Sequence, residues 1–265
     1  PRKVFGVSAT PLTIGGAVAM IEDITERYLV DAVRTDFVAN ISHELKTPVG
    51  ALAVLAEALS QEDDLEVIHR LSEKMVDEAI RVGRTIDDLL ELSRIEFGGE
   101  AVKDEVDAAS ILAESISRAA PLASLHSIKI AMTELPYPLK VVGDRRQLVS
   151  AIGNLVENAV KYSESGSSVE VTARSDGDSV EFAVTDFGLG IPARDLDRVF
   201  ERFYRVDRAR SRDTGGTGLG LAIVRHVANN HGGDVSVTSI EGEGSTFSLK
   251  IPKFVGREQD MRESA

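Results

Sequence analysis

The stretch ISHELKTP, at residues 41–48, lies within a long run of regularly spaced apolar side chains. From about residue 24 to 60 these side chains recur at steps of three, four or seven, which predicts one long amphipathic helix. His43 stands two residues after Ile41 and two before Leu45, so its imidazole should point away from the apolar side. An exposed imidazole is largely neutral at physiological pH and keeps one ring nitrogen free for nucleophilic attack.

The neighbours of His43 suit such a reaction. Glu44 can hold the opposite N–H of the ring and stabilise the positive charge that develops during attack. Pro48 cannot donate a hydrogen bond to the Glu44 carbonyl group, so it should bend the helix just beyond the nucleophile. The other histidines lack comparable neighbours, and we interpret them as structural or surface residues: His69, His126, His226 and His231.

A second apolar repeat follows the polar turn SQEDD and continues to about residue 95, so residues 25–97 should form an antiparallel helical hairpin. Two helices cannot close a core around their own apolar stripes, whereas two hairpins can form a four-helix bundle. A homodimer is therefore the expected assembly. Packing of the hairpin against a second domain is the alternative.

The regions on either side of the hairpin have different patterns. Residues 1–24 alternate short apolar stretches with turn-forming pairs, which suits one or two strands but is too little for a domain. After the Gly98-Gly99 pair, residues 105–253 predict an α/β sandwich, with a mostly antiparallel sheet covered by helices on one face. The polar residues 254–265 should form a frayed tail.

The elements expected within the sandwich are short. Helices are predicted at 108–126, 144–162 and 217–231, and strands at 169–174, 180–186, 234–239 and 246–252. The turn SDGDS between the first two of these strands is typical of a hairpin. Asp144 and Gln147 open the middle helix as a variant of the capping box.

One face of the helix at 144–162 carries Asn154, Asn158 and Lys161. Amide oxygens are hard ligands that suit Mg²⁺, and an adjacent ammonium group suits phosphate. The face could therefore hold the metal-bound triphosphate of a nucleotide. Taken alone, a hydrated helix face explains the same residues more economically.

Two glycine-bearing segments favour the nucleotide. In DFGLGIP (186–192), Asp186 can accept a hydrogen bond from an amine, while Gly188 and Gly190 let the backbone turn closely around a base. GGTGLGLAI (215–223) leads into a helix, where three glycines would let backbone N–H groups meet phosphate oxygens: Gly216, Gly218 and Gly220. Walker A and Rossmann loops are excluded on spacing.

The segment between them, residues 191–214, is rich in arginine and carries the aromatic residues Phe200, Phe203 and Tyr204. We interpret it as a mobile lid. Arg205 within it could neutralise charge that develops on a transferred phosphoryl group, although solvated surface is the simpler explanation of any single arginine here.

The composition narrows the remaining possibilities. With 43 acidic and 30 basic residues, the formal net charge of -13 opposes non-specific binding to nucleic acid. The absence of cysteine excludes disulfides and cysteine-based metal sites. No apolar run approaches the roughly 20 residues that cross a bilayer.

In chain order, these stretches resemble the motifs of the sensor histidine kinases of two-component systems, over roughly residues 25–253. ISHELKTP is similar to the phosphoacceptor box, NLVENAVKYS (154–163) to the N box, DFGLGIP to the first glycine box, FERFYR (200–205) to the F box, GGTGLGLA to the second glycine box and GEGSTF (242–247) to the third.

The resemblance implies that His43 is the phosphoacceptor and Glu44 the base, with Thr47 orienting a water when the protein dephosphorylates its partner. It implies ATP and Mg²⁺ as cofactors. Roles are implied for Asn154 and Asn158 at the metal, for Asp186 at the adenine amine, for Lys161, Tyr162 and Arg205 at phosphates or ribose, and for Gly188, Gly190, Gly216, Gly218, Leu219, Gly220 and Thr246 elsewhere around the nucleotide.

The same resemblance implies an architecture and partners. The helical hairpin would form a dimeric four-helix bundle, followed by an α/β sandwich of the GHKL (Bergerat) ATP-binding type. The partner would be the receiver domain of a response regulator. Residues 1–24 look like the last strands of a PAS sensor domain, and the wording is most similar to actinobacterial phosphate-sensing kinases. We expect the cytoplasmic portion of a protein anchored in the membrane through segments outside this sequence.

Two other classes of protein are the alternatives. A GHKL ATPase of the gyrase or mismatch-repair type would carry a glutamate where Asn154 stands and would lack ISHELKTP. A non-catalytic dimeric scaffold would show degenerate nucleotide boxes, whereas each box here is intact. Glu157 is a minor departure, because it adds negative charge near the proposed metal.

Overall fold

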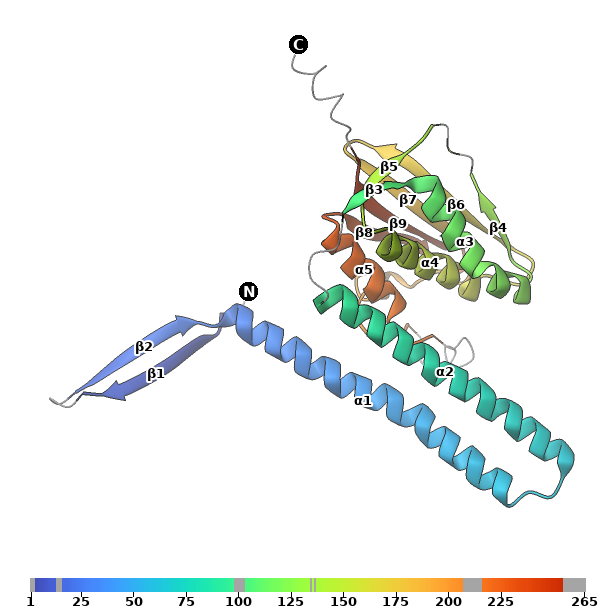
Figure 1. The fold of residues 1–265 in the computed structure, drawn as a ribbon, viewed down its shortest axis with the longest axis horizontal. Coiled ribbons are helices and arrows are strands. Elements are labelled where there is room, and N and C mark those ends of the chain that lie inside the picture. Colours follow the sequence, from blue (N-terminus) through green and yellow to red (C-terminus); the bar gives the residue numbers. More distant parts are fainter. Residues whose placement is uncertain are drawn as a thin grey trace, which may run out of the picture. The chain divides into compact units, whose positions relative to one another are not determined.

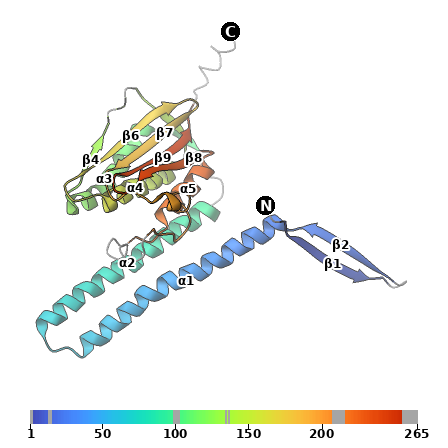
Figure 2. The same ribbon diagram turned by 180° about the vertical axis from the view of Figure 1, so that it is seen from behind.

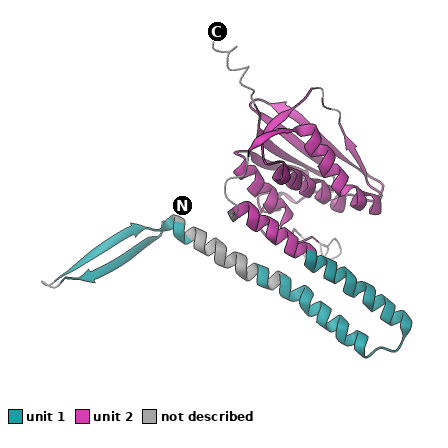
Figure 3. Cartoon of the chain, viewed as in Figure 1, with its two compact units in different colours: residues 1–83 teal, residues 84–265 magenta. Residues whose placement is uncertain are grey.

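The computed structural model describes residues 3–12, 16–97, 103–133, 135, 137–206 and 216–254, apart from the side chains of 26, 29–40, 43, 44 and 97. The chain divides into two compact units, residues 1–83 and residues 84–265, and the boundary falls inside a helix (Figure 3). Among the described residues, no helix combines the length and the apolar composition that crossing a bilayer requires.

The first unit contains most of the helical hairpin that the apolar repeat predicts, up to residue 83 of α2. β1 (Phe5–Pro11) pairs antiparallel with β2 (Ala17–Asp23), and then α1 spans Thr25–Ser60 and α2 spans Leu65–Phe97. α1 continues through Pro48. Large apolar side chains of the helical hairpin are more than half exposed: Val49, Val54, Leu65, Val76 and Ile80. Between residues 49 and 83 no described side chain is buried, so this part of the hairpin lacks a core of its own.

The second unit is built on a five-stranded sheet. Its strands lie in the order β4 (Lys129–Met132), β6 (Ser168–Asp176), β7 (Ser179–Asp186), β9 (Gly244–Pro252) and β8 (Asp234–Ile240). β4 is parallel to β6 and the other neighbours are antiparallel, so the predicted mostly antiparallel sheet is confirmed. A separate ladder joins β3 (Asp104–Asp107) to β5 (Lys140–Gly143).

Three helices cover one face of this sheet, as predicted (Figures 1 and 2). They are α3 (Ala108–Leu125), α4 (Arg145–Tyr162) and α5 (Gly220–Asn230). α4 is the central one, and its Ile152 and Leu155 are fully buried, as is Phe182 of β7. Burial of each such side chain contributes about 1.5–3 kcal/mol, so α4 is firmly held and can position polar groups on its opposite face.

The start of α4 shows where the capping-box prediction is half wrong. The Asp144 carboxylate accepts the N–H groups of Arg146 and Gln147 at 2.8 and 3.2 Å, as expected of an N-cap. The return bond from Gln147 is not made, because the Asp144 N–H donates to His231 Nε2 at 2.9 Å. Gln147 Oε1 is buried and has no hydrogen-bond partner. His231, which is 3% exposed, is thus confirmed as a structural histidine.

Candidate active site

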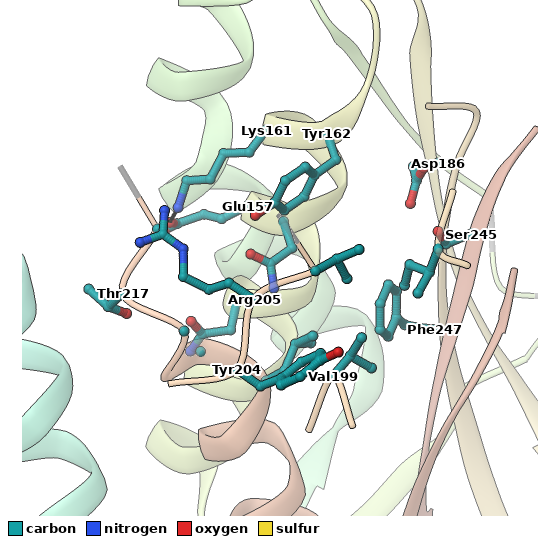
Figure 4. Close-up of a pocket in the computed structure, with 18 of the residues that line it drawn as sticks. Glu157, Lys161, Tyr162, Asp186, Val199, Tyr204, Arg205, Thr217, Ser245 and Phe247 are labelled. Atoms are coloured by element: carbon teal, nitrogen blue, oxygen red, sulfur yellow. Dashed lines mark hydrogen bonds and ion pairs between the residues drawn. The ribbon is translucent and has the colours of Figure 1, made fainter. Parts of the chain in front are cut away.

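A cavity of about 960 Å³ opens in the second unit, beside the polar face of α4. The cavity is lined by α4, by the segments that follow β7 and precede α5, by Ser245 and Phe247 of β9, and by the part of α2 that begins at Arg84. The volume lies within the range of about 300–1,000 Å³ that small-molecule sites occupy. Figure 4 shows Asp186, Ser245 and Phe247 at one end, and Glu157, Lys161 and Arg205 at the other.

The first end, which we call the carboxylate end, is organised around Asp186. This residue closes β7 and is only 4% exposed. Burial raises the pKa of the Asp186 carboxyl, and hydrogen bonds from Gly188 and Ser245 oppose the rise. A buried carboxylate beside the apolar wall of Phe247 can accept a hydrogen bond from a donor on a flat, largely apolar ligand.

Gly188 and Gly190 shape the loop at this end, for a reason different from the predicted one. A Cβ atom on Gly188 would lie 2.0 Å from the Tyr162 carbonyl oxygen. Gly190 has a φ of 63°, and a Cβ atom there would lie 2.0 Å from the Ile240 carbonyl oxygen. Both positions therefore require glycine, because any side chain there would collide with the neighbouring backbone. Gly190 also lines the cavity, whereas Gly188 is not among the lining residues.

The opposite, polar end contains the predicted side chains of α4. Asn154, Asn158 and Lys161 all line the cavity, together with Tyr162 and the predicted Arg205. Lys161 Nζ forms a 3.0 Å ion pair with Glu157 Oε2, so the glutamate noted as a departure is the ion-pair partner of this lysine. The prediction that α4 presents a polar stripe to one site is confirmed.

The segment before α5 completes the polar end. Gly216, Gly218 and Gly220 line the cavity as predicted, and Gly220 begins α5. A Cβ atom on Gly220 would lie 2.6 Å from Asn154 Oδ1, so a larger residue at the start of α5 would displace the Asn154 amide. Leu219 differs from its neighbours because it is fully buried and does not line the cavity.

Thr246 lies away from the cavity, contrary to its predicted place at the nucleotide. Successive residues of a strand face opposite sides of the sheet. Ser245 and Phe247 line the cavity, while the Thr246 hydroxyl lies 3.0 Å from that of Thr185 on the other face. Ser245 was missed by the sequence analysis. Strand alternation could have identified it, since an apolar Phe247 must face inward and Ser245 shares its side.

α2 supplies further residues that sequence patterns did not indicate. Arg84, Asp88 and Glu91 line the cavity, and Thr217 also faces it. Burial raises the pKa of the Asp88 carboxyl, while the Thr217 hydroxyl and the Lys161 charge lower it. No local pattern marks Asp88, because its role arises only when α2 meets the segment before α5.

The predicted lid is packed where the structure describes it. Phe200 and Phe203 are buried, and the Tyr204 hydroxyl donates to Asp195 Oδ1 at 2.7 Å. Residues 193–206 therefore pack as part of the cavity wall. Residues 207–214 of the predicted lid lie outside the described residues.

The predicted nucleophile belongs to the other unit. The backbone of His43 and Glu44 is helical, within α1, and their side chains lie outside the described part of the chain. Thr47 is exposed on the same helix, one turn further on.

Comparisons with known proteins agree with these observations. Residues 33–98 match the family model described as His Kinase A (phospho-acceptor) domain. Residues 143–254 match the model described as Histidine kinase-, DNA gyrase B-, and HSP90-like ATPase. The first match contains His43. The second match contains every residue that lines the cavity except Arg118 and the residues of α2.

The proteins that are similar in sequence to this chain include sensor kinases. The sensor-like histidine kinase SenX3 of Mycolicibacterium smegmatis is 52% identical over 241 residues, which cover 90% of this chain and 62% of SenX3. The phosphate regulon sensor protein PhoR of Pseudomonas aeruginosa is 36% identical over 236 residues, which cover 86% of this chain and 52% of PhoR. The chain thus spans less than two thirds of the length of either relative.

A solved structure shares the fold. The histidine kinase ThkA, in a crystal structure with the response regulator protein TrrA, superposes with a TM-score of 0.67 and 20% identity. The superposition covers 94% of this chain and 75% of ThkA. A helical hairpin followed by an α/β sandwich is therefore a fold that this chain shares with ThkA.

Proposed function

Since this chain belongs to the sensor histidine kinases, with a phospho-acceptor domain followed by an ATPase domain, we propose that it phosphorylates its own His43 from ATP and then passes the phosphoryl group to an aspartate of a response regulator. The observation that carries the proposal is the polarity of one cavity, which has a buried carboxylate at one end and the amides and ammonium group of α4 at the other.

The cavity fits an adenine nucleotide in one orientation. The adenine amine can donate to the buried Asp186, with Phe247 against the base. The triphosphate then reaches the polar end, where Lys161 and Arg205 supply positive charge. The reverse orientation would place the phosphates against the buried Asp186 carboxylate and away from Lys161 and Arg205, which electrostatic repulsion opposes.

Magnesium suits the same end of the cavity. Asn154 and Asn158 supply amide oxygens, which are hard ligands, and Glu157 adds a carboxylate one helical position before Asn158. These three residues would hold Mg²⁺ together with phosphate oxygens. The metal would supply charge neutralisation at the transferred phosphoryl group.

His43 has the chemistry of an acceptor. Its neutral imidazole attacks the γ-phosphorus, a P–N bond forms and the P–O bond to ADP breaks. Glu44 would take the proton that the ring loses, and Arg205 would balance charge on the transferred group. In a separate phosphatase reaction Thr47 would orient the water that attacks the aspartyl phosphate of the response regulator and releases inorganic phosphate.

The assembly in this proposal is a homodimer. The exposed apolar side chains of the helical hairpin would be covered by those of a second hairpin in a four-helix bundle. A cytoplasmic position of this portion is part of the proposal, because both ATP and a response regulator would be available there. A phosphate-linked signal is proposed on the similarity to PhoR, and residues 1–24 as the end of a PAS domain on their strand pattern.

Labelling tests the proposal directly. The chain is incubated with γ-labelled ATP and Mg²⁺, and we expect an acid-labile, base-stable label that His43→Gln abolishes. His69→Gln is the matched control, because His69 is an exposed histidine on a helix of the same hairpin. Free phosphate without labelled protein would instead indicate a GHKL ATPase, and the absence of both products a non-catalytic scaffold.

A further inference from the structure

Ser239 stands behind the wall of the cavity, at the end of β8. Its hydroxyl donates to the Gly244 carbonyl oxygen at 2.8 Å and accepts the Ile191 N–H at 2.8 Å. Ile191 belongs to the loop that follows β7, and Gly244 begins β9. One side chain therefore joins the two segments that enclose the carboxylate end.

The same hydroxyl reaches a residue of the cavity itself. Ser239 Oγ lies 3.0 Å from Ser245 Oγ. A serine hydroxyl has one proton and can accept two hydrogen bonds. Because the Ser239 proton is given to Gly244, the remaining acceptor position of Ser239 is available to the Ser245 hydroxyl. Ser245 is thus held from behind.

Ser245 in turn serves Asp186. Both its backbone N–H and its hydroxyl form hydrogen bonds with the Asp186 carboxylate, and these bonds lower the pKa of that group. A hydroxyl has one proton, so Ser245 gives it either to Ser239 behind it or to Asp186 in front, while the Ser245 backbone N–H donates to Asp186 in both cases. The carboxylate that we assign to the adenine amine rests on a hydroxyl whose position Ser239 sets.

We infer that Ser239 is a positioning residue that fixes Ser245 and the two loops around Asp186, and thereby sets the preference of the site for adenine over purines without the amine. This inference rests on the proposed function, since it concerns the base of the same nucleotide. Ser239 touches no part of the phosphate end, so its effect should fall on binding and base selection rather than on phosphoryl transfer.

Equilibrium titration of the whole chain with ATP, ADP and inosine triphosphate (ITP) tests the inference. ITP carries a carbonyl oxygen in place of the adenine amine. We expect Ser239→Ala to weaken ATP and ADP binding by about tenfold each, and ITP binding much less, so that the ITP-to-ATP ratio of dissociation constants falls. In autophosphorylation KM for ATP should rise by a similar factor, with kcat within about twofold of the wild type.

Two variants complete the design. Ser239→Thr keeps the hydroxyl and should restore the ratio, while Ser236→Ala makes the same chemical change at an exposed position of β8 and should alter nothing. Should circular dichroism show Ser239→Ala to be unfolded, Ser239→Cys keeps the volume with a weak donor and should show the same fall in the ratio.

The outcomes separate the two claims. Wild-type affinity for ATP in Ser239→Ala, or equal weakening of ATP and ITP, would overturn the role of Ser239 and leave the kinase proposal standing. Failure of the wild-type chain to bind any adenine nucleotide would remove the proposed function, and with it this inference.

Discussion

The Thr217 hydroxyl donates a 2.6 Å hydrogen bond to the Asp88 carboxylate, which joins α2 to the segment that leads into α5. Both residues line the polar end of the cavity. A carboxylate therefore lies at the end of the site where we place the phosphates, and it shares its surroundings with Lys161. In the proposed orientation, the negative charge of Asp88 on α2 would therefore repel the triphosphate.

We expect Asp88→Asn to tighten ATP binding by roughly threefold to tenfold, because the amide keeps an acceptor for Thr217 and removes a negative charge. The gain should be smaller for AMP, which has fewer charged phosphates. Calorimetric titration with both nucleotides measures the difference. Asp87→Asn is the control, since Asp87 is exposed and lies outside this cavity. Unchanged ATP affinity in Asp88→Asn would contradict the orientation of the nucleotide.

Asn158→Ala should reduce labelling of His43 by about a hundredfold or more, because a metal ligand at the transferred phosphoryl group is lost. The dimer should persist, since Asn158 belongs to the second unit, whereas the exposed apolar side chains of the helical hairpin between residues 49 and 83 belong to the first. Labelling and light scattering on the same sample check both points. Asn229→Ala, at an exposed position of α5, should leave both unchanged. Full labelling of Asn158→Ala would refute the metal assignment.

Gly188→Ala should lower the free energy of unfolding by about 2–4 kcal/mol, because its Cβ atom would collide with the Tyr162 carbonyl oxygen. Gly83→Ala is the contrasting change, because no atom lies within 4 Å of a Cβ atom there and alanine favours a helix by about 0.5–1 kcal/mol. Urea unfolding of each variant gives the two values. A stable Gly188→Ala chain would show that the loop can shift away.

His231 makes stability depend on pH in a defined direction. Burial lowers the pKa of its imidazole from the ordinary value of 6.5, so the unfolded chain binds the proton more tightly. The stabilising contribution of the neutral, buried His231 to the free energy of unfolding is therefore complete above about pH 6.5 and is lost as the pH falls below that value. Free energies of unfolding at pH 7.5 and 5.5 should differ less in His231→Gln than in the wild type. The exposed His69→Gln should keep the wild-type difference, and an unaltered difference in His231→Gln would exclude this origin.

The sequence predicted the parts of the molecule that repeat or alternate. The long helices were found because their apolar residues recur over many turns, and β6 and β7 because they surround a clear turn. The strands β3, β4 and β5 were missed, since each has four residues and too few positions for a pattern to emerge.

The errors at the site arise from contacts between distant residues. Gln147 fails to complete its capping box because His231, far along the chain, takes the same N–H group. Thr246 was predicted to contact the nucleotide because it lies within the motif GEGSTF. Only the residues of β9 on one side of the sheet face the cavity, and Thr246 is on the other side. Asp88 carries no local signal at all.

The β1–β2 ribbon has a consequence for handling the protein. Within the described residues no third strand joins it, and its apolar side chains are more than half exposed: Phe5, Val7, Met20 and Ile21. Unpaired strand edges next to exposed apolar side chains can pair with strands of other molecules and so promote aggregation. Precipitation of stored samples should therefore begin at this ribbon, and a chain trimmed to start at Thr25 should keep longer in solution.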